Sequence, residues 1–129
     1  MTSIYKDYFS YVKKWKNIYG EKTLVIMEVG KFYEIYALKD DDGNIHENDM
    51  EAVEQMSFLN IGDKKFKYND MSVLQAGFNT IGLDKFVKIF QENDYTTVIY
   101  EQDSPGKNAT RSLSQIISPG TYIDDDSSS

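Results

Sequence analysis

A glycine, a large aromatic residue and a carboxylate lie close together in the run from Gly30 to Glu34, which reads GKFYE. If this run enters a strand, Phe32 and Glu34 face the same way, and Tyr33 and Ile35 face the other, because side chains two positions apart share a face. An exposed phenyl ring can enter between two base steps of a nucleic acid and hold a kink. A carboxyl group beside it can hydrogen-bond the edge of the base, as a donor when protonated or as an acceptor when ionised.

Four segments in order resemble one known family. The pattern Gly-x-Phe-Tyr-Glu, which follows the apolar run from Leu24 to Val29, resembles the mismatch-recognition motif of the MutS family of DNA mismatch-repair proteins. Further matches are a block that opens with QAGF at 75–78 and continues through Leu83 and Phe86, the strand-like YTTVIYEQ at 95–102, and ISPGT at 117–121. The resemblance covers about residues 3 to 123, which correspond to the first domain of much longer proteins.

The resemblance implies a fold, partners and a place in a larger protein. It implies an α/β fold, a single domain with a mixed β-sheet flanked by helices, over residues 1–123, with 124–129 as an acidic, serine-rich start of a linker. The implied partners are double-stranded DNA with mismatches or small loops and the remaining domains of a parent protein, which is expected to be a dimer. The ATPase of the family, with its ATP and Mg²⁺, is expected outside this chain, because no Gly-x-x-x-x-Gly-Lys-Ser/Thr run occurs here. The chain itself is expected to be a binding domain without a cofactor and not an enzyme.

The resemblance also assigns roles to particular residues. Phe32 and Glu34 are expected to contact a base. The candidates for contacts with the DNA backbone are basic: Lys31 first, then Arg111, and after them Lys64, Lys65, Lys67 and Lys107. The chain departs from the family in two places, since Gln115 replaces a second arginine and Asn79-Thr80-Ile81 replaces the common Pro-Tyr-His.

Composition indicates one compact domain. The chain has 129 residues, of which 40% are hydrophobic, and no cysteine, so it can bury a core and has neither a disulfide framework nor a thiolate metal site. No apolar stretch approaches the roughly 18 residues that cross a bilayer, and the N-terminus lacks the apolar region of a secretory signal. An intracellular protein without a membrane partner is expected.

The net charge of −7 is unusual for a chain that binds nucleic acid. Residues 1–39 hold seven lysines and four acidic residues, whereas residues 40–129 hold seven basic and seventeen acidic residues. The candidate motif therefore lies in the basic part, but long-range attraction to phosphate must be weak. We expect other domains of the parent to supply most of the affinity.

Hydrophobic periodicity predicts the elements that position the motif. Helices are expected at 3–18, 48–57 and 82–93, the second capped by Asn48 or Asp49, and strands at 23–29, 32–38, 71–77, 95–101 and 111–118. Gly20 should end the first helix, Gly30-Lys31 should make a tight turn, and 40–44 should make another. Residues 58–70 are expected to be a polar connection.

Each functional interpretation has an ordinary alternative. Phe32 could be a core residue, Glu34 a surface residue on an edge strand, and each lysine a solvated side chain. Asp40, Asp42, Asn44 and Glu51 have the spacing of a calcium loop, but Ile45 stands where that loop needs glycine. His46 is expected to be exposed.

Two other functions remain open on the sequence alone. One is a small metal-dependent nuclease, in which carboxylates would hold Mg²⁺ beside Lys31; the candidates are Glu28, Glu34, Glu101 and Asp103. The other is a protein-interaction module without a role in DNA binding.

Overall fold

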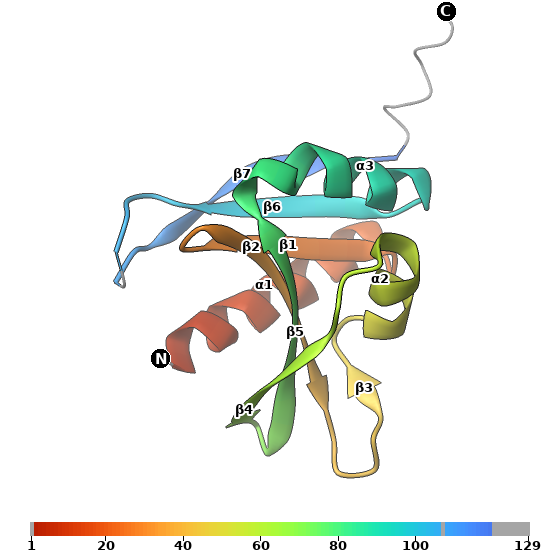
Figure 1. Cartoon of the computed structure of the whole chain (residues 1–129), viewed down its shortest axis with the longest axis vertical. Helices are drawn as coiled ribbons and strands as arrows, with labels where there is room; N and C mark the ends of the chain where they lie inside the picture. The colour runs from red at the N-terminus through yellow and green to blue at the C-terminus, as the bar shows by residue number, and fades with distance from the viewer. Residues whose placement is uncertain (1, 107, 120–129) are drawn as a thin grey trace, which may run out of the picture.

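The computed structural model describes residues 2–106 and 108–119. The described residues form three α-helices, one 3-10 helix and seven strands (Figure 1), in the order α1 (Thr2–Tyr19), β1 (Thr23–Val29), β2 (Phe32–Lys39), β3 (Ile45–His46), α2 (Met50–Ser57), β4 (Gly62–Tyr68), β5 (Met71–Asn79), η1 (Thr80–Gly82), α3 (Leu83–Glu92), β6 (Thr96–Gln102) and β7 (Arg111–Ile117).

All seven strands belong to one mixed sheet. Six of them lie in the order β4-β5-β2-β1-β6-β7, and β3 pairs with β2. β1 and β6 are parallel, and the other pairs are antiparallel. The predicted single α/β domain with a mixed sheet flanked by helices is confirmed.

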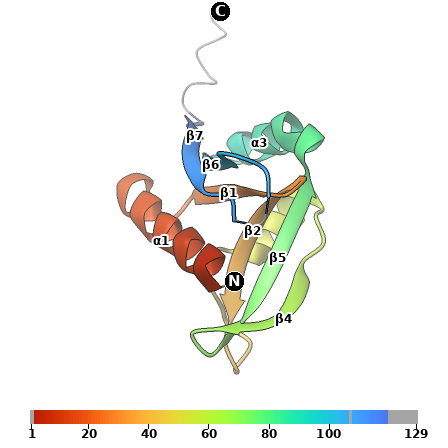
Figure 2. The ribbon, with the colours of Figure 1, turned by 90° about the vertical axis from the view of Figure 1, so that its left-hand side faces the viewer.

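The sheet separates two hydrophobic cores. Figure 2 shows α1 on one side of the sheet and α3 on the other, and α2 shares its core with α3. Alternation along β2 supplies both cores, because Tyr33 and Ile35 pack with α2 and α3, whereas Tyr36 and Leu38 pack with α1. The predicted division of β2 into two faces is therefore confirmed.

The three predicted helices are present within one or two residues of their expected bounds. Gly20 ends α1 with a φ of +99°, a left-handed conformation that glycine adopts without a steric penalty. Asp49 is the N-cap of α2, where its Oδ1 accepts from the Ala52 N–H at 3.1 Å. No helix in the described part of the chain is both long and apolar enough to span a membrane.

The prediction of a polar connection over 58–70 was wrong, because β4 lies within it and pairs with β5. β4 reads GDKKFKY and is largely exposed at the edge of the sheet, so it lacks the apolar alternation of a half-buried strand. Lysines are common on edge strands because they oppose pairing with other chains. The two-residue strand β3 was missed as well, since it is too short to produce a pattern.

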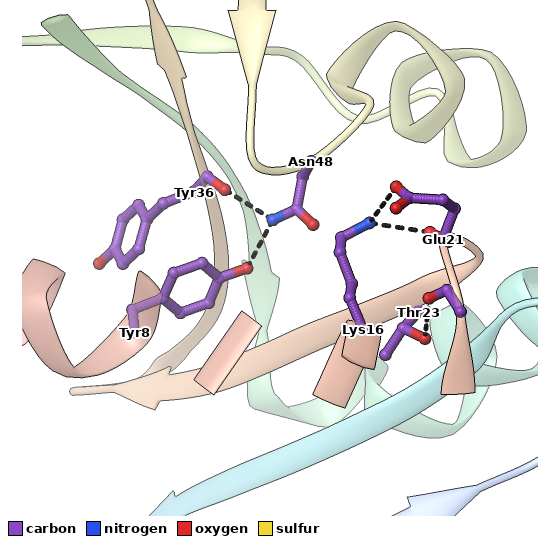
Figure 3. A network of polar contacts seen from close by, with 7 residues as sticks. Tyr8, Lys16, Glu21, Thr23, Tyr36 and Asn48 are labelled. Carbon is purple, nitrogen blue, oxygen red and sulfur yellow. Dashed lines mark hydrogen bonds and ion pairs between the residues drawn. The ribbon is translucent and has the colours of Figure 1, made fainter. Parts of the chain in front are cut away.

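A buried amide joins α1, β2 and the start of α2 (Figure 3). Asn48 Nδ2 donates to the Tyr8 hydroxyl at 2.9 Å and to the Tyr36 carbonyl at 2.7 Å. The Tyr8 hydroxyl in turn donates to the Val25 carbonyl on β1 at 2.7 Å. Burial raises the pKa of Tyr8, so its hydroxyl stays protonated and donating. Figure 3 also shows Lys16 bound to Glu21, a contact that closes the connection from α1 to β1.

Asn48→Ala should lower the free energy of unfolding by about 2–3 kcal/mol, because it leaves the buried Tyr36 carbonyl without this donor. The neighbouring Asp49→Ala removes a helix cap and should cost only about 1 kcal/mol. Urea unfolding of both variants checks the prediction. If Asn48→Ala lowers the free energy of unfolding no more than Asp49→Ala does, the Asn48 amide does not hold α1, β2 and α2 together.

Candidate nucleic-acid interface

The candidate motif lies on a tight hairpin between β1 and β2. Val29 pairs with Phe32, so Gly30 and Lys31 alone make the turn. Gly30 has a φ of +64°, which suits glycine at a two-residue hairpin turn. The turn therefore places Phe32 at the first position of β2 and leaves Lys31 exposed at the tip.

Phe32 is outside the core. Its side chain is 48% exposed and lies on the α1 face of the sheet, in register with Val29 and Asn79. Tyr33 points to the opposite face, where it is 4% exposed and packs against Phe78 with ring centroids 5.9 Å apart. Tyr33 thus anchors the start of the strand while Phe32 remains free to contact a partner. The alternative of a core phenylalanine does not fit this placement.

Glu34 shares the face of Phe32 but is only 7% exposed. β2 is an interior strand between β1 and β5, so Glu34 is not on an edge strand. Its Oε1 accepts from the Tyr36 hydroxyl, and its Oε2 accepts from Gln75 Nε2 at 2.9 Å. Burial raises the pKa of Tyr36, and the charge of Glu34 raises it further, so the phenol keeps its proton. The carboxylate is therefore held by two donors.

Gly77 makes room for the Glu34 side chain. The two residues are paired across β2 and β5. A Cβ atom at Gly77 would lie 3.1 Å from the Tyr33 carbonyl oxygen and 3.4 Å from Glu34 Cγ. The backbone oxygen cannot give way easily, so a side chain at this position would displace the carboxylate. This gives a physical reason for the glycine in the QAGF segment.

An open hollow of about 350 Å³ lies beside Phe32 and Glu34. Its other walls are Gln75 and Gly77 on β5 and the segment 60–62 at the start of β4. We call it the Phe32 hollow. It combines one aromatic wall with a buried carboxylate and an amide, a combination that suits a flat ring with polar edges.

The end of β6 holds the hairpin in place. Gln102 Oε1 accepts from the Gly30 N–H at 2.9 Å, and Gln102 Nε2 donates to the Gly30 carbonyl at 3.4 Å. The Gln102 N–H donates to Glu28 Oε1 at 2.8 Å. The neighbouring Glu101 Oε2 accepts from the Tyr33 hydroxyl at 2.6 Å. Gln102 was not among the predicted site residues, and Glu101 was considered only as a metal ligand of the alternative nuclease, although the Glu-Gln end of YTTVIYEQ was a signal for both.

Arg111 belongs to the same arrangement. Its Nε donates to the Glu28 carbonyl at 2.7 Å, and its Nη2 donates to Gln102 Oε1 at 3.4 Å. A third bond, from Nη1, reaches the Ala109 carbonyl at 3.3 Å. The guanidinium thus binds acceptors on β1, on β6 and in the loop before β7, so it helps to position the hairpin, and its predicted contact with phosphate stays a prediction.

The other basic candidates are spread along the sheet. Lys64, Lys65 and Lys67 are exposed on β4. Lys67 is level with Ser72 of β5, whereas Phe32 is level with Asn79. At about 3.3 Å per residue, these levels are roughly 23 Å apart. Lys67 Nζ also lies 3.8 Å from Asp41 Oδ1. Lys107 lies outside the described residues.

A second exposed apolar residue lies next to the hairpin. Ile81 on η1 is 90% exposed. The Asn79 Oδ1 atom accepts from the Ile81 N–H at 3.0 Å, and the Thr80 N–H donates to the Lys31 carbonyl at 3.1 Å. The Asn79-Thr80-Ile81 segment, a departure from the family pattern, is therefore attached directly to the turn that precedes Phe32.

The carboxylates proposed for a nuclease have separate hydrogen-bond partners. Glu28 accepts from Gln102, and Glu101 from Tyr33. Asp103 accepts from Thr110 and Ser112, and these bonds lower its pKa. Within residues 2–106 and 108–119, no three His, Cys, Asp or Glu side chains converge as metal ligands.

The segment from Asp40 to Asn44, which has the spacing of a calcium loop, forms a turn closed by its own hydrogen bonds. Asp40 Oδ1 accepts from the N–H groups of Asp42 and Asn44 at 3.0 and 2.9 Å. Its Oδ2 lies 2.8 Å from His46 Nε2, and this bond lowers the pKa of Asp40. His46 is partly exposed, as expected. The Asp40 carboxylate thus stabilises the turn between β2 and β3.

Comparisons with known proteins show the family of this chain. A mutS homolog of Acanthamoeba polyphaga mimivirus, named as a DNA mismatch repair protein, is 34% identical over 95% of this chain and 11% of its own length. A mitochondrial DNA mismatch repair protein mutS homolog of Sarcophyton glaucum is 23% identical over 97% of this chain and 15% of its own length. The chain therefore spans only a small part of each relative. The family model for MutS domain I matches residues 7–126 of the sequence. The chain therefore belongs to the MutS domain I family of mismatch-recognition domains.

Proposed function

We propose that this chain is the mismatch-recognition domain of a longer DNA mismatch-repair protein. In this proposal Phe32 enters the duplex at a mispaired base, and Glu34 contacts the edge of that base. The observation that carries the proposal is the exposed Phe32 ring on a braced hairpin, beside a hollow that contains the Glu34 carboxylate. Membership of the MutS domain I family supports DNA as the partner.

The energetics favour a mispaired site over paired DNA. Stacking of one aromatic side chain on a base contributes roughly 1–3 kcal/mol, and separating one base step costs a few kcal/mol. These contributions nearly cancel when the pair is intact. A mismatched base costs less to displace, so the balance becomes favourable where pairing is lost. Selectivity then comes from the deformability of the DNA rather than from its sequence.

The acidic charge indicates that other domains provide most of the affinity. The net charge of −7 opposes binding to phosphate. The relatives that this chain resembles are far longer than the matched part. In our proposal the remaining domains, and a second copy of the parent, grip the DNA and hydrolyse ATP, while this domain binds without catalysing a reaction.

Phe32→Ala in the parent protein should remove most of the discrimination between mismatched and paired duplexes, because the stacking contribution of roughly 1–3 kcal/mol is lost. Thermal stability should change little, since the ring is half exposed. The matched control is Phe58→Ala, a phenylalanine that is 88% exposed at the end of α2. Retained discrimination in Phe32→Ala, or an equal loss in Phe58→Ala, would contradict the proposed insertion.

Lys31→Ala should weaken binding to mismatched and paired duplexes about equally, and should lower the slope of log K against log salt by roughly one unit, because one phosphate contact is lost. Lys88→Ala, an exposed lysine on α3, should leave the slope unchanged. Titrations at several salt concentrations measure both effects. A changed mismatch preference with an unchanged slope would assign Lys31 a different role.

Gln102→Leu should lower the mismatch discrimination of the parent by about tenfold, because the Gly30 peptide loses its two side-chain bonds and Phe32 is no longer fixed. Gln115→Leu is the control, since Gln115 is exposed on β7. Affinity for paired DNA should be the same in both variants. Equal discrimination in Gln102→Leu and in the unmodified protein would show that the bonds from Gln102 to Gly30 are not needed for mismatch recognition.

A further inference from the structure

Gln75 is a polar residue in the Phe32 hollow with a direct link to Glu34. It lies on β5, level with Tyr36 on one side and Gly62 on the other, so it faces the same side of the sheet as Phe32 and Glu34. Its Nε2 atom donates to Glu34 Oε2 at 2.9 Å. A base edge that enters the hollow toward Glu34 therefore meets the amide of Gln75 as well.

Both donors on Glu34 leave the carboxylate as an acceptor. The Tyr36 hydroxyl bonds Oε1, and the Gln75 amide bonds Oε2. Tyr36 keeps its proton, because burial and the nearby carboxylate raise its pKa. Each carboxylate oxygen can accept more than one hydrogen bond, and the amide oxygen of Gln75 is a further acceptor. The group that best complements this pair is an N–H donor.

We propose that Gln75 sets the base preference of this site, because it holds Glu34 as an acceptor and so favours mispaired thymine and guanine over adenine and cytosine. The inference rests on the proposed function, since it requires that a base reach the hollow. On the pairing edge, thymine N3 and guanine N1 carry a proton, whereas adenine N1 and cytosine N3 present a lone pair. An accepting carboxylate attracts the first two and repels the second two at the ring nitrogen.

The mismatches G·T and A·C separate these two cases at alkaline pH, because both bases of G·T then have a protonated ring nitrogen, whereas the A·C pair has lost the proton that adenine N1 carries in the wobble pair. The measurement is the ratio of the A·C and G·T dissociation constants for the parent protein at fixed salt and pH. The unmodified protein should favour G·T. Gln75→Leu should lower the ratio by about threefold to tenfold, the scale of one hydrogen bond. Gln55→Leu, an exposed glutamine on α2, is the matched control and should leave the ratio unchanged.

Gln75→Glu provides a second test. If Gln75 had only a structural role, this variant would not produce the shift predicted here. Two carboxyl groups within hydrogen-bond distance cannot both stay ionised, so they take up one proton, and the resulting O–H group can turn to donate to the ring nitrogen of an entering adenine or cytosine. This variant should shift the preference toward A·C, beyond the ratio of Gln75→Leu. Thermal unfolding of each variant checks that the fold is retained.

The outcomes separate this inference from the proposed function. A clear preference for mismatched over paired DNA, with an A·C to G·T ratio that is the same in the unmodified protein, Gln75→Leu and Gln75→Glu, would overturn the role of Gln75 and leave the proposed function intact. An unmodified protein that favours A·C would do the same. Equal affinity for mismatched and paired DNA would overturn both.

Discussion

The attachment of the β1–β2 turn to the end of β6 is the interaction on which the rest of the site depends. The Gly30 N–H donates to the side-chain amide of Gln102, and the Gly30 carbonyl accepts from the same amide. Arg111 donates both to Gln102 and to the Glu28 carbonyl. An apolar ring that is exposed to water would otherwise fold back on the protein or move freely. A turn that is already fixed would reduce the ordering cost of the proposed binding to DNA. The parallel pairing of β1 with β6 makes this possible, because it brings residues 30 and 102 to the same end of the sheet.

In the proposed function, the site separates selectivity from affinity. One aromatic ring and one carboxylate supply only a few kcal/mol, and the negative charge of the chain opposes its approach to DNA. Under this proposal such a domain would add little to the affinity for any duplex, but most of what it added would depend on the state of one base pair. Neighbouring domains with a stronger grip would then retain the protein on DNA while this domain tests the pairing. The buried position of Glu34 fits this division, because its two donors keep the carboxylate in one orientation.

The sequence predicted the local features well, because they depend on short-range patterns. Alternation along β2 predicted that Phe32 and Glu34 share one face and Tyr33 lies on the other, and hydrophobic periodicity predicted all three helices. The burial of Glu34 depends on β5, forty residues away, and on the absence of a side chain at Gly77, so no local pattern could predict it. β4 was missed because an exposed edge strand with lysines has no apolar alternation. The bonds of Arg111 likewise depend on pairing between β6 and β7.

The most direct test of the account is fluorine NMR of the parent protein with 4-fluorophenylalanine in place of Phe32. A ring that stacks on a base experiences the ring current of that base, so its resonance should move upfield when a mismatched duplex is added. The same resonance should stay near its free position with a fully paired duplex of otherwise identical sequence, even when binding is saturated. The same shift with both duplexes, or no shift with the mismatched one, would contradict the claim that Phe32 enters the duplex where pairing is lost.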